Sequence, residues 1–584
     1  MAKSDARFEY RANLNRESHD LSYPFGFTAA PGMLLPVFAD LATPKDTYYI
    51  EHDLEYLRTL PMLAPAMVDV KIHFESFFVP FQMIYQPVEQ TLYSLTDFQS
   101  SMFNQGSAQN TNFPLFDNVN MRDGIMSTAY NHSKEHADMF RLYDMLGMNA
   151  DSVAYDGSNP SRCAWSPYFF PWQLLAYHTI FNYFYRLDDK DPFRAAESNW
   201  DFYYASTSPV GNSTNMVMIH QRPWDFDYFT SLYRSPIVSS LNTQTVIASG
   251  QYSNLLGSYT LRISDAGSQT GVNSDVRAFA PNFPATYNNN TANLNVSTAA
   301  IRQMFANEKL AMITGRARKT YDAQVLAHFG AEVPHDPKHD IAFIGRDTYM
   351  LKVGEVTSLA STSGAGLGDL AGKGWANGKG RKHKFVAPCH GVVMTIFSVE
   401  PLKRYYGGFD RINSLTNTFD IPQPEFDRLG NVPMFRYETG ENAGSGVVQL
   451  TDIVGWKERY YWNKRRHPKV TLAFMNAAVT RGYNEYGSYM LTSAPFGAYT
   501  STNNNTARPD LVERFYIDRN CMDGLMFEPF VNAWQTGATG EETTENWNAT
   551  PWLSYRRDPF IVDLNLKVQK VSWMSKDGEP IYNF

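Results

Sequence analysis

The chain has 584 residues and a formal net charge of -8, with 19% charged and 15% aromatic residues. This acidic balance argues against a protein that coats nucleic acid over its whole surface, but it allows a local basic face. The aromatic and proline content favours a loop-rich β-protein and excludes a plain helical bundle.

The cysteines and the first residues restrict the chemistry further. Cys163, Cys389 and Cys521 stand far apart and match neither a disulfide framework nor a zinc or redox spacing. No apolar segment follows the charges of the first twenty residues, and no run of about 18 apolar residues occurs anywhere. We therefore expect a chain made in the cytosol, with buried thiols.

Residues 1–20 are polar and carry regularly spaced cations. Such a segment is typical of a disordered arm or a basic tether, and equally of a merely solvated tail. The cations are Lys3, Arg7, Arg11 and Arg16. We treat them as candidate DNA contacts.

The stretch Val68–Pro80 is the clearest strand of the chain. Its apolar and polar residues alternate up to Glu75, the pattern of a strand with one buried face, and the alternation breaks at Ser76 before an apolar run. Residues 391–400 and 561–573 have the same β-branched and aromatic content, and we expect both to be its partners. The sequence thus predicts a β-core whose neighbouring strands are joined by very long insertions.

The order of motifs around this strand resembles the major capsid protein of the Microviridae, the small single-stranded DNA bacteriophages, and especially its gokushovirus-like branch. The matching stretches are Leu35-Pro36-Val37, Pro61-Met62, Ala64-Pro65 and Phe77-Phe78-Val79-Pro80. Further similarity lies in Tyr321, Val325, Leu326, His328, Phe329 and Gly330, in Gly354 to Thr357, and in residues 419–430 and 455–468. It thins over residues 100–160, the polar insertion described below and residues 480–550.

Two segments have helical patterns. Residues 167–188 are apolar almost all round, as in a helix buried on most sides. Residues 301–329 carry an apolar stripe that is interrupted after Gly315 and resumes from Tyr321, with Gly330 placed to end the helix.

Residues 199–297 are rich in Asn, Ser, Thr, Gly and Tyr and form a polar surface insertion with short strand-like pieces, for example at 259–263. Adaptable polar side chains mixed with tyrosines suit a recognition surface, while a tolerated insertion explains the same composition. The resemblance implies a protrusion at the threefold axes that meets the host surface.

Two basic clusters include aromatic neighbours. The first ends a Ser/Gly loop and contains Lys379, Arg381, Lys382 and Lys384; the second contains Lys464, Arg465, Arg466 and Lys469. Cations neutralise phosphates and exposed rings stack on unpaired bases, so both are candidate contacts to single-stranded DNA. The alternatives are a solvated face or salt bridges to a neighbouring subunit. The loop fails the phosphate-loop pattern, and its GxGxxA string at 366–371 is not followed by a helical pattern.

No catalytic motif or convincing metal motif is visible, so we expect no enzyme, cofactor or metal. The HxxxH pairs His132/His136 and His335/His339 are weak signals, the second because prolines flank it. The alternative function is a secreted carbohydrate-active or carbohydrate-binding β-protein. The carboxylates to inspect for it are Asp225 and Asp227, or Glu541 and Glu542.

Together, the residues and the resemblance predict a mainly β protein, an eight-stranded viral jelly-roll sandwich with long loop insertions that contain a few helices, formed as a single domain over residues 1–584. The resemblance implies a T = 1 icosahedral shell of identical subunits around circular single-stranded DNA, assembled in the host bacterial cytoplasm. It also implies three kinds of partner: minor virion or DNA-pilot proteins, small basic internal proteins and a host surface receptor.

Overall fold

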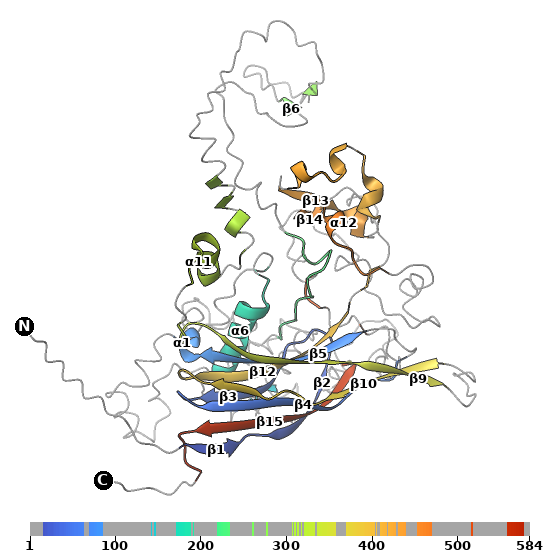
Figure 1. Ribbon diagram of the computed structural model, residues 1–584. Coiled ribbons are helices and arrows are strands. Elements are labelled where there is room, and N and C mark those ends of the chain that lie inside the picture. Colours follow the sequence, from blue (N-terminus) through green and yellow to red (C-terminus); the bar gives the residue numbers. More distant parts are fainter. Residues whose placement is uncertain are drawn as a thin grey trace, which may run out of the picture.

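The computed structural model describes about half of the chain (Figure 1). The described residues are 16–62, 69–85, 171–187, 219–233, 321–332, 336–357, 370–402, 453–469 and 558–576, most of 404–439, and short pieces or single residues elsewhere, among them 145–147, 260–261, 276–277, parts of 306–317, and 515–517. No described helix is long and apolar enough to cross a membrane.

Two antiparallel sheets face each other. The larger has the order β1-β15-β4-β10-β9, with β2 also pairing β15 and β11 also pairing β4. Its strands are β1 (Glu17–Asp20), β2 (Tyr23–Ala29), β4 (Thr47–Thr59), β9 (Lys352–Thr357), β10 (Leu370–Gly378), β11 (His383–Val386) and β15 (Phe560–Ser572). The smaller has the order β3-β12-β5-β8 and consists of β3 (Leu35–Ala42), β5 (Val70–Pro80), β8 (Ala342–Met350) and β12 (Gly391–Pro401).

The predicted mainly β sandwich is confirmed, and its strands are divided more finely than the expected eight. In the larger sheet β1 and β2 lie end to end along β15, because the chain breaks the ladder between Asp20 and Tyr23. Likewise β11 and β10 lie end to end along β4. These two pairs, together with β15 and β4, occupy four positions across the sheet, and β9 adds a further edge strand.

Alternating side chains of the two sheets fill the core. The inward residues of β15 are apolar and less than 2% exposed from Phe560 to Val568. Phe397 of β12 contacts Phe27 of β2 across the sandwich, with ring centroids 5.0 Å apart, and Phe74 of β5 at 5.1 Å. Full burial of each such side chain contributes about 1.5–3 kcal/mol, so this interior dominates the stability of the fold.

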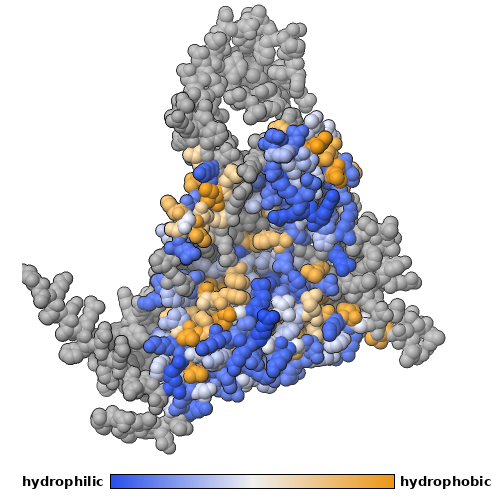
Figure 2. All heavy atoms as spheres, in the orientation of Figure 1, coloured by the Kyte–Doolittle hydropathy of each residue, from blue (hydrophilic) through white to orange (hydrophobic). Residues whose placement is uncertain are grey.

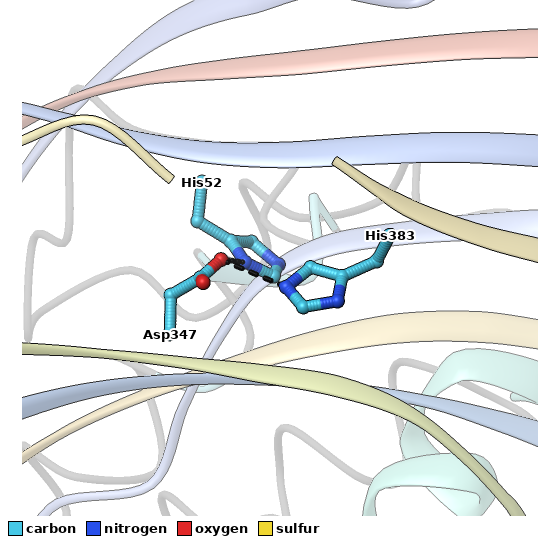
Figure 3. A group of neighbouring side chains, drawn as sticks. All are labelled: His52, Asp347 and His383. Atoms are coloured by element: carbon cyan, nitrogen blue, oxygen red, sulfur yellow. Dashed lines mark hydrogen bonds and ion pairs between the residues drawn. The ribbon is translucent and has the colours of Figure 1, made fainter. Parts of the chain in front are cut away.

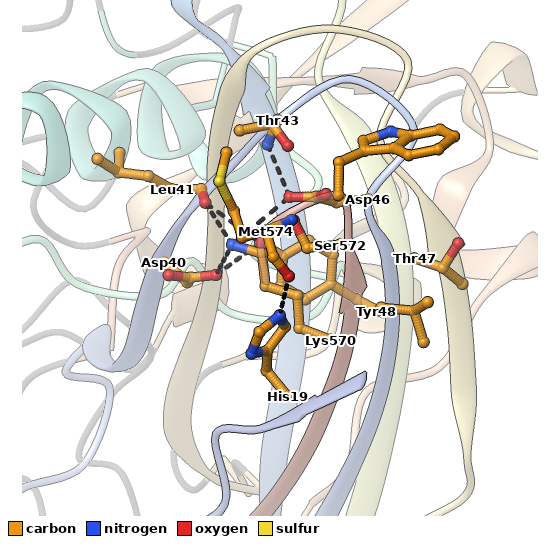
Figure 4. Close-up of polar contacts among 12 residues, drawn as sticks. His19, Asp40, Leu41, Thr43, Asp46, Thr47, Tyr48, Lys570, Ser572 and Met574 are labelled. Atoms are coloured by element: carbon orange, nitrogen blue, oxygen red, sulfur yellow. Dashed lines mark hydrogen bonds and ion pairs between the residues drawn. The ribbon is translucent and has the colours of Figure 1, made fainter. Parts of the chain in front are cut away.

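Polar residues also join the sheets at one end of the sandwich (Figure 4). The Lys570 ammonium of β15 donates to Asp40 Oδ2 at 2.9 Å and to the Leu41 carbonyl at 2.8 Å, both on β3. The amine is mostly buried and lies 5.3 Å from the Tyr48 ring centroid. The long apolar stem of Lys570 thus crosses the core while its charge is neutralised on the facing sheet.

Strand β5 confirms one expectation and corrects two. It pairs with β12 along its whole length, as expected. However, β15 lies in the facing sheet and is not its partner. The strand is also buried on both faces, because His73 and Glu75, expected on an open face, are covered. The break at Ser76 coincides with a register shift against β8 between Ser76 and Phe77.

A helix covers this second face of β5. Helix α6 (Trp172–Ile180) continues as a π-helical turn, η2 (Phe181–Tyr185), and α1 (Phe81–Ile84) lies beside it. Residues 174–182 are buried, which confirms the predicted all-round apolar helix. The Tyr177 hydroxyl donates to the Leu34 carbonyl at 2.9 Å and fixes α6 to the segment before β3.

Residues 219–233 lie within the predicted surface insertion, yet they pack on the sandwich. Trp224, Tyr228, Phe229 and Leu232 are buried. Backbone hydrogen bonds of 2.9 Å in both directions join Tyr233 to Trp456. This segment therefore connects the sandwich to a second group of elements, which we call the distal module.

The distal module comprises residues 409–439 and 453–469, as far as these are described. It contains β13 (Asn431–Phe435), β14 (Ile453–Glu458), α12 (Tyr461–Lys464) and the 3-10 turns η4 (Arg411–Ser414), η5 (Thr418–Asp420), η6 (Pro424–Phe426) and η7 (Arg436–Thr439). In Figure 1 it lies on the side of the smaller sheet, and the hairpin of β6 (Thr260–Leu261) with β7 (Val276–Arg277) lies farther out on that side.

Helix α11 (Tyr321–Phe329) forms where the apolar stripe resumes, and it ends at Gly330, whose φ of 66° only glycine adopts readily. None of its residues is buried: Tyr321 is 76% and Phe329 is 81% exposed. The apolar stripe predicted from the sequence is present, but no described part of the chain covers it.

Candidate nucleic-acid interface

We call the outer surface of the larger sheet the open face, because no described helix covers it, and the outer surface of the smaller sheet the covered face. On the open face, Lys384 of β11 stands opposite Tyr49 of β4 in the ladder. The amines of Lys382 and Lys384 lie 4.8 and 5.8 Å from the centre of the Tyr49 ring. Lys379 and Arg381, just before β11, are also exposed. The first predicted cluster is thus assembled around a ring.

A second group on the open face was missed by the sequence analysis. Trp375 of β10 stands opposite Arg58 of β4 on one side and Lys352 of β9 on the other. Its neighbours Gly374 and Ala376 point inward, while Trp375 is 36% exposed and its ring centre lies 5.2 Å from the Lys352 amine. The sequence offered one signal for this group, an aromatic residue in a Gly-rich strand with basic neighbours. Only the pairing register of β4, β10 and β9 shows that Arg58 and Lys352 flank Trp375.

Carboxylates are present on the open face as well, and one of them, Asp53, accepts from the Gly380 amide at 3.0 Å beside the first group. Lys567 of β15 is paired with Asp53, and the Asn565 amide donates to Glu55 at 2.9 Å. The cations named above still form two patches, each with amines close to one ring, Tyr49 or Trp375. Such patches can neutralise phosphates and stack on bases without reading a sequence.

Arg16 is held against the same sheet. Its guanidinium donates to the Val571 carbonyl at 3.0 Å and to Thr47 Oγ1 at 2.9 Å, and it lies 5.3 Å from the Trp573 ring centre. Lys3, Arg7 and Arg11 lie outside the described residues. Arg16 therefore fixes the point where the preceding segment joins the sheet.

The second predicted basic cluster lies on the opposite side of the sandwich, in the distal module (Figure 1). Lys464 is paired with Asp427, and Lys469 with Asp410 at 3.1 Å. Arg465 and Arg466 are exposed, whereas His467 between them and Lys469 packs on Tyr228 and Phe229, each 5.0 Å away. The structure does not bring the two clusters together.

A buried ionic network holds residues 219–233 on the covered face. Arg222 donates to Glu75 Oε2 at 2.9 Å and to Ser398 Oγ at 3.0 Å. Arg346 and the Tyr185 hydroxyl also contact the Glu75 carboxylate. Burial acts to raise the pKa of Glu75, but the charges of Arg222 and Arg346 outweigh it and hold that pKa below its ordinary value. Glu75 is therefore ionised, with a guanidinium group beside each of its oxygens.

The carboxylates proposed for a glycosidase have structural partners. Asp227 Oδ1 accepts from the backbone amides of Phe229 and Thr230 at 2.9 and 2.8 Å, and its Oδ2 accepts from the Tyr405 hydroxyl at 2.6 Å. Asp225 pairs with Lys71 at 3.1 Å. Glu541 and Glu542 lie outside the described residues. The two aspartates thus hold the segment to its neighbours.

Of the two HxxxH pairs, only His339 is described, and its ring nitrogen lies 2.8 Å from exposed Asp336. A different histidine cluster joins His52, Asp347 and His383 (Figure 3). Sequence reasoning missed it because 295 positions separate His52 from Asp347. Burial lowers the pKa of His52, so its ring is neutral.

A family model described as "Capsid protein (F protein)", of the phage F family, matches residues 9–105 and 153–523, which is most of the chain. The chain belongs to the phage F capsid protein family. No curated protein matches the sequence. This membership confirms the predicted Microviridae-type major capsid protein, a structural protein of the virion that self-assembles into a shell. The match ends before β15, although that strand lies inside the larger sheet.

Proposed function

We propose that this phage F capsid protein is the coat subunit of a small T = 1 icosahedral shell around circular single-stranded DNA, of the gokushovirus-like branch. The observation that carries the proposal is the difference between the two outer faces of the sandwich. Cations and rings gather on the open face, while the distal module and the β6–β7 hairpin lie on the side of the covered face.

In this proposal the open face lines the interior of the shell. Tyr49 and Trp375 offer platforms on which unpaired bases stack, and the surrounding lysines and arginines neutralise phosphates. The contact needs no base sequence, which suits a whole genome laid against many copies. The N-terminal cations Lys3, Arg7 and Arg11 would extend this surface inward from the point fixed by Arg16.

The covered face then points outward. The insertion, residues 199–297, forms the protrusion that meets a host surface receptor, with residues 219–233 as its stem on the sandwich. Minor virion or DNA-pilot proteins and small basic internal proteins join during assembly in the host cytoplasm.

Neighbouring subunits meet through two apolar surfaces that the single chain leaves exposed (Figure 2). One is on and before α11, and the other is in the distal module. The first comprises Leu310, Tyr321, Leu326 and Phe329, and the second Phe409, Ile412 and Ile421, each about half exposed or more. Because a ring of three or five identical copies needs two different surfaces in each contact, we pair the first with the second.

Charge supports this pairing. Exposed carboxylates, among them Asp322 and Glu332, lie beside the α11 surface. The exposed guanidinium groups of Arg465 and Arg466 lie in the module that carries the other. The second basic cluster then binds a neighbouring subunit, and the first binds DNA.

The test compares two double variants in particles assembled with the phage genome. Lys382→Gln with Lys384→Gln removes the cations over Tyr49, and Arg465→Gln with Arg466→Gln removes the same charge from the distal module. Electron microscopy and the DNA-to-protein ratio are measured for both. We expect closed T = 1 particles that hold less DNA, or DNA released at lower salt, only for the first pair. Normal DNA content in the first pair and loss in the second would overturn the assignment of the open face.

A further inference from the structure

The His52, Asp347 and His383 cluster joins the two sheets of the sandwich at one edge (Figure 3). His52 is on β4, His383 is on β11 beside it, and Asp347 is on β8 of the facing sheet. His52 Nδ1 lies 2.7 Å and His383 Nε2 lies 3.0 Å from the same oxygen, Asp347 Oδ2. Two imidazoles from one sheet thus converge on one carboxylate of the other.

The surrounding contacts hold the three side chains in place. His52 Nε2 lies 2.8 Å from Ser76 Oγ, which in turn lies 2.8 Å from Thr395 Oγ1. Asp347 Oδ1 accepts from the Arg381 backbone amide at 3.3 Å. His52 also stacks on Phe74, with ring centres 5.6 Å apart. A hydrogen-bond partner at the second ring nitrogen orients a metal-bound histidine in known sites, and Ser76 Oγ occupies that position here.

Burial and access also suit an ion. The His52 side chain is fully buried and that of Asp347 is 6% exposed, whereas His383 is 16% exposed. The cluster is therefore shielded on the His52 side and reachable past His383, at the start of β11. An enclosed set of ligands with one accessible member allows an ion to enter without unfolding the sandwich.

We propose that His52 Nδ1, His383 Nε2 and Asp347 Oδ2 bind one divalent first-row transition metal ion, with Zn²⁺ as the best fit. Two imidazoles and one carboxylate suit zinc, which takes four ligands and leaves one position here for water. Ca²⁺ and Mg²⁺ are disfavoured, since they prefer oxygen ligands. On binding, each neutral ring keeps its single N–H proton on the nitrogen that faces away from the metal, so the proton of His52 lies on Nε2 and donates to Ser76.

Such an ion cross-links the two sheets, because its ligands come from both. No backbone ladder connects β8 to β11, so the cluster is the polar connection between these two strands among the described residues. A bound ion stabilises only the folded sandwich, and it therefore raises the temperature of unfolding. The proposal is independent of which face meets DNA.

The test uses the full-length chain stripped with a chelator and titrated with Zn²⁺, with Ca²⁺ in parallel. Bound metal is measured by elemental analysis after dialysis, and unfolding by calorimetry. We expect one zinc per chain and a higher Tm with zinc only. His383→Gln, at the accessible position, removes both effects, while Ser76→Ala weakens zinc binding about 10–100-fold.

The matched control is His73→Gln. His73 is another buried histidine with a carboxylate neighbour, Glu400 at 3.1 Å, and a hydroxyl, Thr348, at its second nitrogen, but the group that shares its carboxylate is the Arg222 guanidinium at 3.7 Å and not a second imidazole. This variant keeps zinc binding, and the circular dichroism of each variant reports its fold. Zinc bound equally by wild type and a folded His383→Gln variant, or no zinc bound by either, overturns the proposal.

Discussion

Charged side chains have opposite surroundings on the two outer faces of the sandwich. On the covered face, charged side chains are buried and paired, as Glu75 is with Arg222, and they bind one part of the chain to another. On the open face, the exposed residues Lys352, Lys382 and Lys384 place their amines over the rings of Trp375 and of half-buried Tyr49. The same residue types therefore stabilise the subunit on one face and form a candidate ligand surface on the other. Local composition does not distinguish these roles; the partner of each charge does.

The largest expected effect is on shell assembly through the apolar surface of α11. Phe329→Ser with Tyr321→Ser removes two exposed rings from α11, where neither is buried in the single chain. We expect the folded subunit to keep its Tm within about 2 °C, since surface changes alter stability by less than about 0.5 kcal/mol, yet to fail to form shells. Sedimentation and electron microscopy measure assembly, and normal shells would contradict the α11 contact.

The next-largest effect tests how residues 219–233 are held on the covered face. Arg222→Met leaves the buried Glu75 without its closest partner from residues 219–233, and breaking such a pair costs about 3–5 kcal/mol. Arg404→Met is the control, because Arg404 meets Asp69 only at 4.0 Å and both are exposed, so its loss costs less than about 1 kcal/mol. Urea unfolding of the two variants measures the difference, and equal losses would show that the network is not what anchors the insertion stem.

A smaller effect is expected on the open face. Trp375→Ala removes one stacking platform and weakens binding of a short single-stranded oligonucleotide to the unassembled chain by about 1–3 kcal/mol. Tyr56→Ala is matched in exposure, at 40% against 36% for Trp375, but Tyr56 stands opposite Asp563. We expect Tyr56→Ala to change binding little. Fluorescence anisotropy at fixed salt measures both, and an equal loss would mean that exposed rings, and not the basic patches, decide the contact.

The smallest effect concerns the cations of the distal module. Arg465→Gln with Arg466→Gln changes exposed residues, and we expect the free energy of unfolding of the single chain to shift by less than about 0.5 kcal/mol. Oligonucleotide affinity of the unassembled chain also stays unchanged. A clear drop in the salt dependence of binding would place DNA on the covered side as well.

The sequence predicted the class of fold well and the location of its charges poorly. Periodicity identified β5, β12, β15 and α6, because each buries a continuous apolar surface that local pattern records. It assigned β15 to the wrong sheet, since strands hundreds of residues apart carry no local sign of their register. The second face of β5 was predicted to be open because its side chains, among them His73 and Glu75, are polar, whereas in the fold they are buried and paired.

The candidate site was only partly visible in the sequence for the same reason. Lys382 and Lys384 were identified as a cluster, but Tyr49, on which they lie, is more than three hundred positions earlier. Trp375 needed the strands on both sides to acquire its cations. Spacing along the chain finds charges, whereas only the paired strands show which charges share a ring, a carboxylate or a metal ion.

The place of β15 in the chain order bears on how the subunit is made. It is the last described strand, yet it lies between β4 on one side and β1 and β2 on the other, which are among the first. On the ribosome the early strands therefore emerge with unpaired edges and wait for most of the polypeptide to follow. Such edges invite pairing with other nascent chains. We therefore expect productive folding of this coat protein to require that its early strands stay apart until translation nears its end, and we expect virion yield to rise with chaperone supply.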